Sequence, residues 1–199
     1  MTFLIGITLE LLYLWIKPTN IITMTNAIKK NGVNFGIILG VYLILVTAIM
    51  YVVDLKLFLE WWIGTLNFVI SLGIGIVAVS KSKKALGGLI TFKEAFTAFF
   101  ITMAIGVTMN VLFNAVLFNV IDPGAKETLK QHLLEFTVAT MQKFDTPSEI
   151  LKTTIEEMQN DDNFGFVAQI KSLVWSLLFY AIAGLLVALV FKNKAKDTL

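Results

Sequence analysis

The chain has 199 residues and a formal net charge of +2, and 57% of its residues are hydrophobic against 15% that are charged. Soluble domains carry about 25% charged residues. This composition, with a mean hydropathy of +0.80, therefore excludes a water-soluble globule and makes the bilayer the solvent of the protein. Every basic residue is Lys, so no guanidinium can clamp phosphate, and nucleic acid is not expected as a partner.

The N-terminal segment, residues 1–23, differs from the rest of the chain. Its apolar run contains Glu10 and is shorter than the roughly 20 residues that a membrane span needs. No basic stretch precedes the run and no small-residue cleavage site follows it, so a signal peptide is not indicated. Met24 then opens a segment typical of a cytoplasmic start. We hypothesise that residues 1–23 are an over-extended start of translation, with a short interfacial helix as the alternative, and that residues 24–199 form a single four-span domain.

Four later runs are apolar, free of charged residues and about 20 residues long or longer, which is the length that a helix needs to cross a hydrocarbon core. They are residues 35–53, 61–80, 95–121 and 173–191. The strands of a β-barrel would instead alternate in polarity over about ten residues. The expected fold class is therefore all-α, an integral membrane four-helix bundle.

Residues 122–165, between the third and fourth runs, are polar but patterned. Apolar residues recur at helical spacing in the first half of this segment. A second helix is predicted to begin with a capping box from Thr146 to Glu149, with Pro147 at the first helical position. Its apolar stripe is Ile150, Leu151, Ile155 and Met158. The segment is predicted to fold as a short amphipathic helical hairpin.

The distribution of Lys predicts the orientation, because cytoplasmic loops are enriched in basic residues. Lys residues precede the first run, connect the second run to the third and follow the fourth, whereas residues 122–165 hold nine acidic residues against four Lys. Both termini are therefore expected in the cytoplasm and residues 122–165 outside it.

Small and polar residues recur at intervals of about four within the runs, so that they share one face of each helix. The positions singled out are Gly36, Gly40, Asn67, Ser71, Thr102, Gly106, Asn110, Asn114, Ser176 and Gly184. Small side chains let helix backbones approach, and amides and hydroxyls can bond across the contact, so helix packing is the preferred interpretation. The alternative is a polar cavity for a small substrate, lined by the amides and the threonine of this set: Asn67, Thr102, Asn110 and Asn114.

The third run also makes a prediction about the rotation of its helix. Its small and polar stripe, from Ala98 to Asn114, is expected to face the other helices. Four large residues are expected to lie mostly elsewhere on the helix: Phe99, Ile101, Leu112 and Leu117.

No catalytic or metal-binding motif is evident. The sequence has no Cys and a single His, so it offers neither a thiolate nucleophile nor the usual ligands of a zinc site. His132 and Glu135 share a helix face by their spacing, but without a nucleophile they are interpreted as a solvated pair. No enzyme activity, cofactor or metal is expected.

Three short stretches carry a resemblance to a known family: residues 90–96 (ITFKEAF), residues 121–123 and residues 185–192. They resemble the bacterial family catalogued as domain of unknown function 4199, which consists of small four-span inner-membrane proteins, over residues 25–194. The resemblance implies the four-span architecture and the inner membrane, and it brings no assigned activity and no site residues.

The sequence thus predicts a non-catalytic integral membrane protein that is a subunit or accessory of a larger inner-membrane assembly. Its expected partners are membrane lipid and either another protein or a second copy of the chain. A small oligomeric transporter or lipid-handling protein is the alternative. A symmetric dimer would favour transport, while co-purification with an unrelated protein would favour the accessory role.

Overall fold

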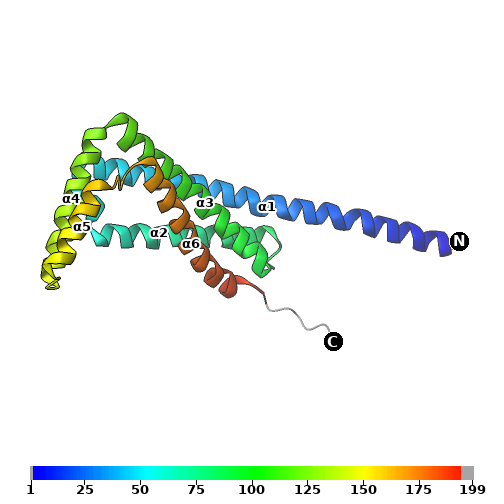
Figure 1. Ribbon diagram of the computed structural model, residues 1–199. Helices are drawn as coiled ribbons and strands as arrows, with labels where there is room; N and C mark the ends of the chain where they lie inside the picture. The colour runs from blue at the N-terminus through cyan, green and yellow to red at the C-terminus, as the bar shows by residue number, and fades with distance from the viewer. Residues whose placement is uncertain (1, 194–199) are drawn as a thin grey trace.

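The computed structural model describes the backbone of residues 2–193 and the side chains of residues 26–193. Within this part the chain is helical apart from short turns (Figure 1). The elements are α1 (Thr2–Val53), the 3-10 turn η1 (Leu55–Leu59), α2 (Trp61–Ala85), α3 (Phe92–Val116), the π-helical turn η2 (Leu117–Ile121), α4 (Pro123–Lys143), α5 (Ser148–Asn160) and α6 (Phe166–Phe191). The expected all-α class is confirmed, as is the helical hairpin, α4–α5, between the third and fourth spans.

Four stretches are long and apolar enough to cross a membrane: Asn26–Val53, Trp61–Ala85, Phe92–Ile121 and Phe166–Phe191. The four predicted runs are confirmed, but each helix extends past the apolar run that predicted it. α2 continues through Lys81, and α6 begins at Phe166 and includes Lys171. Lys is a good helix former whose long side chain can carry its ammonium to the membrane surface, so a helix need not end where charge begins.

Helix α1 begins at Thr2 and runs without a break to Val53. The side chains of residues 1–25 lie outside the described part of the chain. The hypothesis of an over-extended start at residues 1–23 therefore stays a prediction.

Helix α3 is the centre of the bundle. It packs against α1, α2 and α6. α2 and α6 also contact each other, through the ring of Phe68, whose centroid lies 5.4 Å from that of Phe179 and 5.9 Å from that of Tyr180. In Figure 1, α3 and α6 run obliquely across α1 and α2. The main core cluster joins residues of all four helices: Ile28, Leu39, Val79, Leu86, Ile90, Ala95, Ala98, Phe99, Met103 and Ala188.

The bundle has two chemically different ends. The first, here named the lysine end, holds the turn between α2 and α3 and the last turn of α6. The α2–α3 turn places Gly87 and Gly88 at φ angles of 75° and 88°, in the left-handed region that glycine adopts without strain. Asn193 closes this end, because its N–H donates to the carbonyl of Ile90 at 3.1 Å and its Oδ1 accepts from the Ile90 N–H at 2.9 Å.

The second end, here named the hairpin end, holds η1 and the hairpin α4–α5. The two hairpin helices lie side by side across this end of the bundle (Figure 1). α3 gives way to the π-helical turn η2, in which the N–H of Asp122 donates to the carbonyl of Leu117 at 2.8 Å. Asp122 then caps α4 through its Oδ1, which accepts from the N–H of Ala125 at 2.9 Å, and Pro123 occupies the first turn.

The predicted capping box at the start of α5 is wrong. α5 begins at Ser148 with Pro147 as its N-cap residue, and no side chain caps it. Pro147 has non-helical backbone angles, and its carbonyl accepts the first helical hydrogen bond, from the N–H of Leu151 at 3.1 Å. The helix therefore starts one residue too late for Thr146 to act as its cap.

A capping box does form at the start of α3. The N–H of Glu94 donates to Oγ1 of Thr91 at 3.3 Å, and Oε2 of Glu94 accepts from the N–H of Thr91 at 2.8 Å. This box lies within the 90–96 stretch that carries the family resemblance, and it satisfies two backbone donors where the third span begins.

Candidate functional site

A ridge of α3 lies in a groove of glycines on α1. The groove residues Gly32, Gly36 and Gly40 lie opposite the ridge residues Ile101, Ile105 and Met109. A Cβ atom at Gly36 would stand 2.8 Å from Cβ of Ile105, so only glycine permits this approach of the two helices. The contact is reciprocal, because Gly106 of α3 leaves space for the fully buried Leu39 of α1.

Phe99 is the residue of α3 on which α2 and α6 meet. A Cβ atom at Gly75 of α2 would stand 2.6 Å from the Phe99 ring, and one at Gly184 of α6 would stand 2.8 Å from it. The small and polar stripe of α3 is therefore not its only contact surface. Phe99 of α3 and Leu117 of η2 are buried as well, because neighbouring elements cover this span on several sides, whereas Leu112 is 61% exposed.

Polar residues of the stripes bond across helix contacts. Thr47 donates to Oδ1 of Asn110 at 3.0 Å. The hydroxyl of Thr102 lies 2.9 Å from the carbonyl of Ala98 in its own helix and 3.3 Å from the carbonyl of Gly32 on α1, so its one proton is shared between them. Tyr42 donates to Oδ1 of Asn67 at 2.7 Å. Asn67 also accepts a hydrogen bond within α2, because the hydroxyl of Ser71 donates to its backbone carbonyl at 2.7 Å. The structure thus places Asn67, Ser71 and Thr102 in helix contacts.

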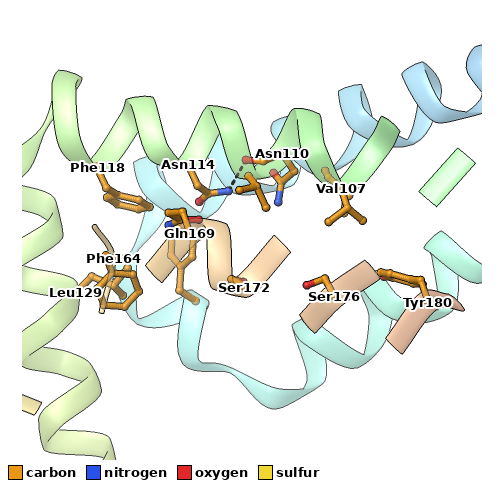
Figure 2. Close-up of a pocket in the computed structure, with 13 residues that line it drawn as sticks. Val107, Asn110, Asn114, Phe118, Leu129, Phe164, Gln169, Ser172, Ser176 and Tyr180 are labelled. Atoms are coloured by element: carbon orange, nitrogen blue, oxygen red, sulfur yellow. Dashed lines mark hydrogen bonds between the residues drawn. The ribbon is translucent and has the colours of Figure 1, made fainter. Parts of the chain in front are cut away.

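A cavity of about 300 Å³ lies between α3 and α6. From α3 it is lined by Asn110 and Asn114, and from α6 by Gln169, Ser172 and Ser176. Figure 2 shows these polar side chains between the two helices, with aromatic rings at both ends of the row. Those rings belong to Phe118 and Phe164 on the side of the hairpin end and to Tyr180 on the other.

The cavity has polar and apolar lining residues and carries no formal charge, since its lining contains no Lys, Asp, Glu or His. Nδ2 of Asn114 donates to the carbonyl of Asn110 at 2.8 Å, which leaves the Asn114 side-chain oxygen for another donor. The side chains of Gln169, Ser172 and Ser176 make no hydrogen bond within the described part of the chain. In a membrane such groups need water or a ligand, because hydrocarbon offers them no partner.

The sequence singled out Asn110, Asn114 and Ser176, which the structure brings together at this cavity. It missed Gln169 and Tyr180. A signal for both was present, because residues 169, 172, 176 and 180 recur at the spacing of one helix face. Gln169 precedes the apolar run that predicts the fourth span, so the polarity pattern does not include it.

Asp122 ties the end of α1 to the start of α4. Its carboxylate accepts from the N–H of Ala125 at 2.9 Å and from the hydroxyl of Tyr51 at 2.7 Å. These bonds, the one from Ala125 first, hold the pKa of Asp122 below its ordinary value, against a smaller opposite effect of burial.

Among the residues that the structure describes, no three His, Asp or Glu side chains lie close enough to hold a metal ion together. His132 and Glu135 lie on α4 beside η1, where both line a second cavity. The expectation that the protein has no cofactor, metal or catalytic activity stays a prediction.

Four apolar helices of spanning length, packed through glycine grooves and interhelical hydrogen bonds, define an α-helical four-span membrane protein. The chain belongs to the family described as protein of unknown function (DUF4199), whose model matches residues 34–193. The resemblance seen in the sequence is thereby confirmed. No curated protein and no solved structure matches the chain.

Proposed function

We propose that this protein is a non-catalytic subunit or accessory of a larger assembly in the bacterial inner membrane, and that the hairpin α4–α5 is the surface that it presents to a protein partner. The lysine end and both termini lie in the cytoplasm, as the enrichment of Lys there favours, and the hairpin end lies outside it.

The exposed apolar residues near the tip of the hairpin carry this proposal. The apolar stripe of α5 is only partly covered, because Leu151, Ile155 and Met158 are half-buried and none of the helix residues is fully buried. Ile150 is 54% exposed, and Phe144, at the turn into α5, is 80% exposed. Amphipathic helices that keep apolar residues accessible are a common means of binding a partner.

The polar ties of the hairpin lie at its base, where α4 begins and α5 ends. Lys126 forms an ion pair with Asp162 at 3.0 Å, and Nζ of Lys130 donates to the carbonyl of Gln159 at 2.7 Å. The tip around Phe144 lies away from these polar ties and is exposed, which supports its use as a projecting contact surface.

Photo-crosslinking in intact cells tests the proposal. A photoreactive phenylalanine analogue replaces Phe144 or Ile150, and the matched control carries it at Leu112, which is equally exposed but lies within the third span. Both hairpin positions should crosslink to the same second polypeptide, and the control should not. Crosslinks that join only copies of this chain would count against the accessory role.

The cavity between α3 and α6 favours a second candidate, a small oligomeric transporter or lipid-handling protein. Its open amides and hydroxyls suit a neutral, hydrogen-bonding solute. Small polyols such as glycerol should then raise the melting temperature of the detergent-solubilised protein, and Gln169→Leu should remove that shift. Asn110 is a poor choice for this test, because its Oδ1 also accepts from Thr47 in the contact with α1. No shift with any small neutral solute would remove this candidate.

A further inference from the structure

A second cavity, of about 250 Å³, lies at the hairpin end between α4 and the segment where η1 passes into α2. Its charged lining consists of Lys56 and Glu60 from that segment and Glu135 from α4. The three side chains are exposed, so their charges are available to a ligand. Groups of both signs thus line one small cavity.

These opposite charges do not neutralise one another. The ion pair in the described part of the chain is that of Lys126 with Asp162, so Lys56 lies more than ion-pairing distance from the carboxylates of Glu60 and Glu135. The ring of His132 also lines the cavity, and its Nδ1 is buried without a hydrogen-bond partner in the described residues. Buried polar atoms in proteins are normally paired. Oε1 of Glu135 accepts from Nε2 of Gln131 at 3.2 Å on the same helix, but this amide carries no charge. The site therefore has a cation and two carboxylates without an ionic partner, and an imidazole nitrogen without a hydrogen-bond partner.

The remaining lining residues indicate the depth of the cavity in the membrane. Trp61 is the first residue of the second span and is 79% exposed, and Phe136 of α4 is 53% exposed. Leu59 completes this apolar side of the cavity. Tryptophan favours the boundary between headgroups and acyl chains, so the charged side of the cavity lies at headgroup level and its apolar side at the level of the first acyl carbons.

We propose that this cavity binds the headgroup of a phospholipid that carries a phosphate and a primary ammonium, as an ethanolamine lipid does. Lys56 pairs with the phosphate, and Glu60 and Glu135 accept hydrogen bonds from the ammonium. Trp61 and Phe136 contact the start of the acyl chains. This inference does not depend on the proposed function, because it concerns the face of α4 that meets η1 and not the apolar face of α5.

The same chemistry predicts which lipids are rejected. A choline headgroup has a positive charge but no N–H to donate, so it cannot satisfy the carboxylates. A glycerol headgroup leaves the lipid with a net negative charge opposite two carboxylates and one Lys, which is unfavourable. The site should therefore prefer ethanolamine over both.

Competitive lipid retention tests the proposal on the full-length protein. The protein is reconstituted in nanodiscs of equal parts phosphatidylethanolamine, phosphatidylglycerol and phosphatidylcholine, and the lipids that stay bound are weighed by native mass spectrometry. Phosphatidylethanolamine should be enriched over the other two. Glu135→Gln should lower that enrichment by about tenfold, the size expected for one charge-assisted hydrogen bond. Lys56→Gln should lower the retention of phosphatidylethanolamine and phosphatidylglycerol alike. The phosphate of either lipid would lose the ammonium group with which it pairs.

The control variant is Glu156→Gln, which removes an exposed carboxylate from α5 outside the cavity and should change nothing. Melting temperatures of all variants check that the fold is kept, and Glu60→Gln replaces Glu135→Gln if the latter unfolds.

Equal retention of the three lipids by the wild type, or an unchanged preference in Glu135→Gln, would overturn the proposal. A free zwitterion is the remaining source of this chemistry, so soluble phosphoethanolamine is added in a separate arm. If it stabilises the lipid-depleted protein as well as the intact lipid does, the ligand is not a lipid and the proposal fails.

Discussion

Gly106 shows how a single hydrogen atom in place of a side chain determines the distance between two helices. A Cβ atom at this position would stand 2.6 Å from Cγ of Leu39 on α1. Gly106→Leu should therefore force α1 and α3 apart and destabilise the detergent-solubilised protein by about 1–3 kcal/mol or more. Thermal melts measure the effect.

Leu112→Ala is the control for this change, because Leu112 lies on the same helix and is 61% exposed. Its melting temperature should stay closer to that of the wild type. A neutral Gly106→Leu beside a damaging Leu112→Ala would mean that α3 is rotated relative to the arrangement described.

The carboxylate of Asp122 gives the hairpin end a dependence on pH. The bonds from Ala125 and Tyr51 lower its pKa in the folded protein. The stabilisation is therefore present above the pKa of the unfolded chain, which is about 3.9 for Asp, and is lost as the pH falls through the lowered folded value. The melting temperature of the wild type should fall in this acid range more steeply than that of Asp122→Asn, whose amide can still cap α4. Parallel acid curves for the two proteins would contradict this role of Asp122.

At the scale of the elements, two Thr-x-x-Glu sequences differ in what they do. Thr91 and Glu94 form both bonds of a capping box at the start of α3, whereas no side chain caps α5. Thr91→Ala should therefore cost about 0.5–2 kcal/mol in the free energy of unfolding, and Thr146→Ala should cost almost nothing. Melts of the two variants in the same detergent measure the difference, and equal losses would show that the cap of α5 is formed after all.

The existence of the spans was predictable, while their ends and contacts were not. An uncharged apolar run of spanning length has few alternatives to a membrane helix, so all four runs were found. The ends were misplaced where Lys171 and Lys81 continue helices that the polarity rule had ended. At α5, the sequence pattern of a capping box is also compatible with a start one residue later, and backbone angles at Pro147 decided between them.

The lining of the cavity between α3 and α6 was only partly predictable, because it depends on how the helices pack against one another. A stripe on one helix shows which residues share a face, but not which neighbour that face meets. Asn67 and Asn110 both accept from a hydroxyl of α1, Asn67 from Tyr42 and Asn110 from Thr47, yet Asn110 also lines the cavity beside α6 and Asn67 does not. The difference depends on where α6 packs against α3, and the close approach of Gly184 to Phe99 is one contact that determines this place.

At the scale of the whole molecule, the proposed orientation can be tested with single cysteines, because the native chain contains no Cys. Lys84 at the lysine end and Ser148 at the hairpin end are both exposed and suit this purpose. A membrane-impermeant thiol reagent added to spheroplasts should label Ser148→Cys and leave Lys84→Cys unlabelled until the membrane is opened. The reverse pattern would invert the proposed topology.

The measurement that tests the accessory role most directly is the mass of the particle extracted from its native membrane in a mild detergent. Native mass spectrometry should find a second polypeptide in complex with the 22.2 kDa chain. Phe144→Asp combined with Ile150→Asp should release that polypeptide, because a charge at the exposed tip of the hairpin cannot be buried in an apolar contact. Particles that contain only whole multiples of this chain, in the wild type and in the double variant alike, would contradict the proposal that the protein works as a subunit bound to a partner through α4–α5.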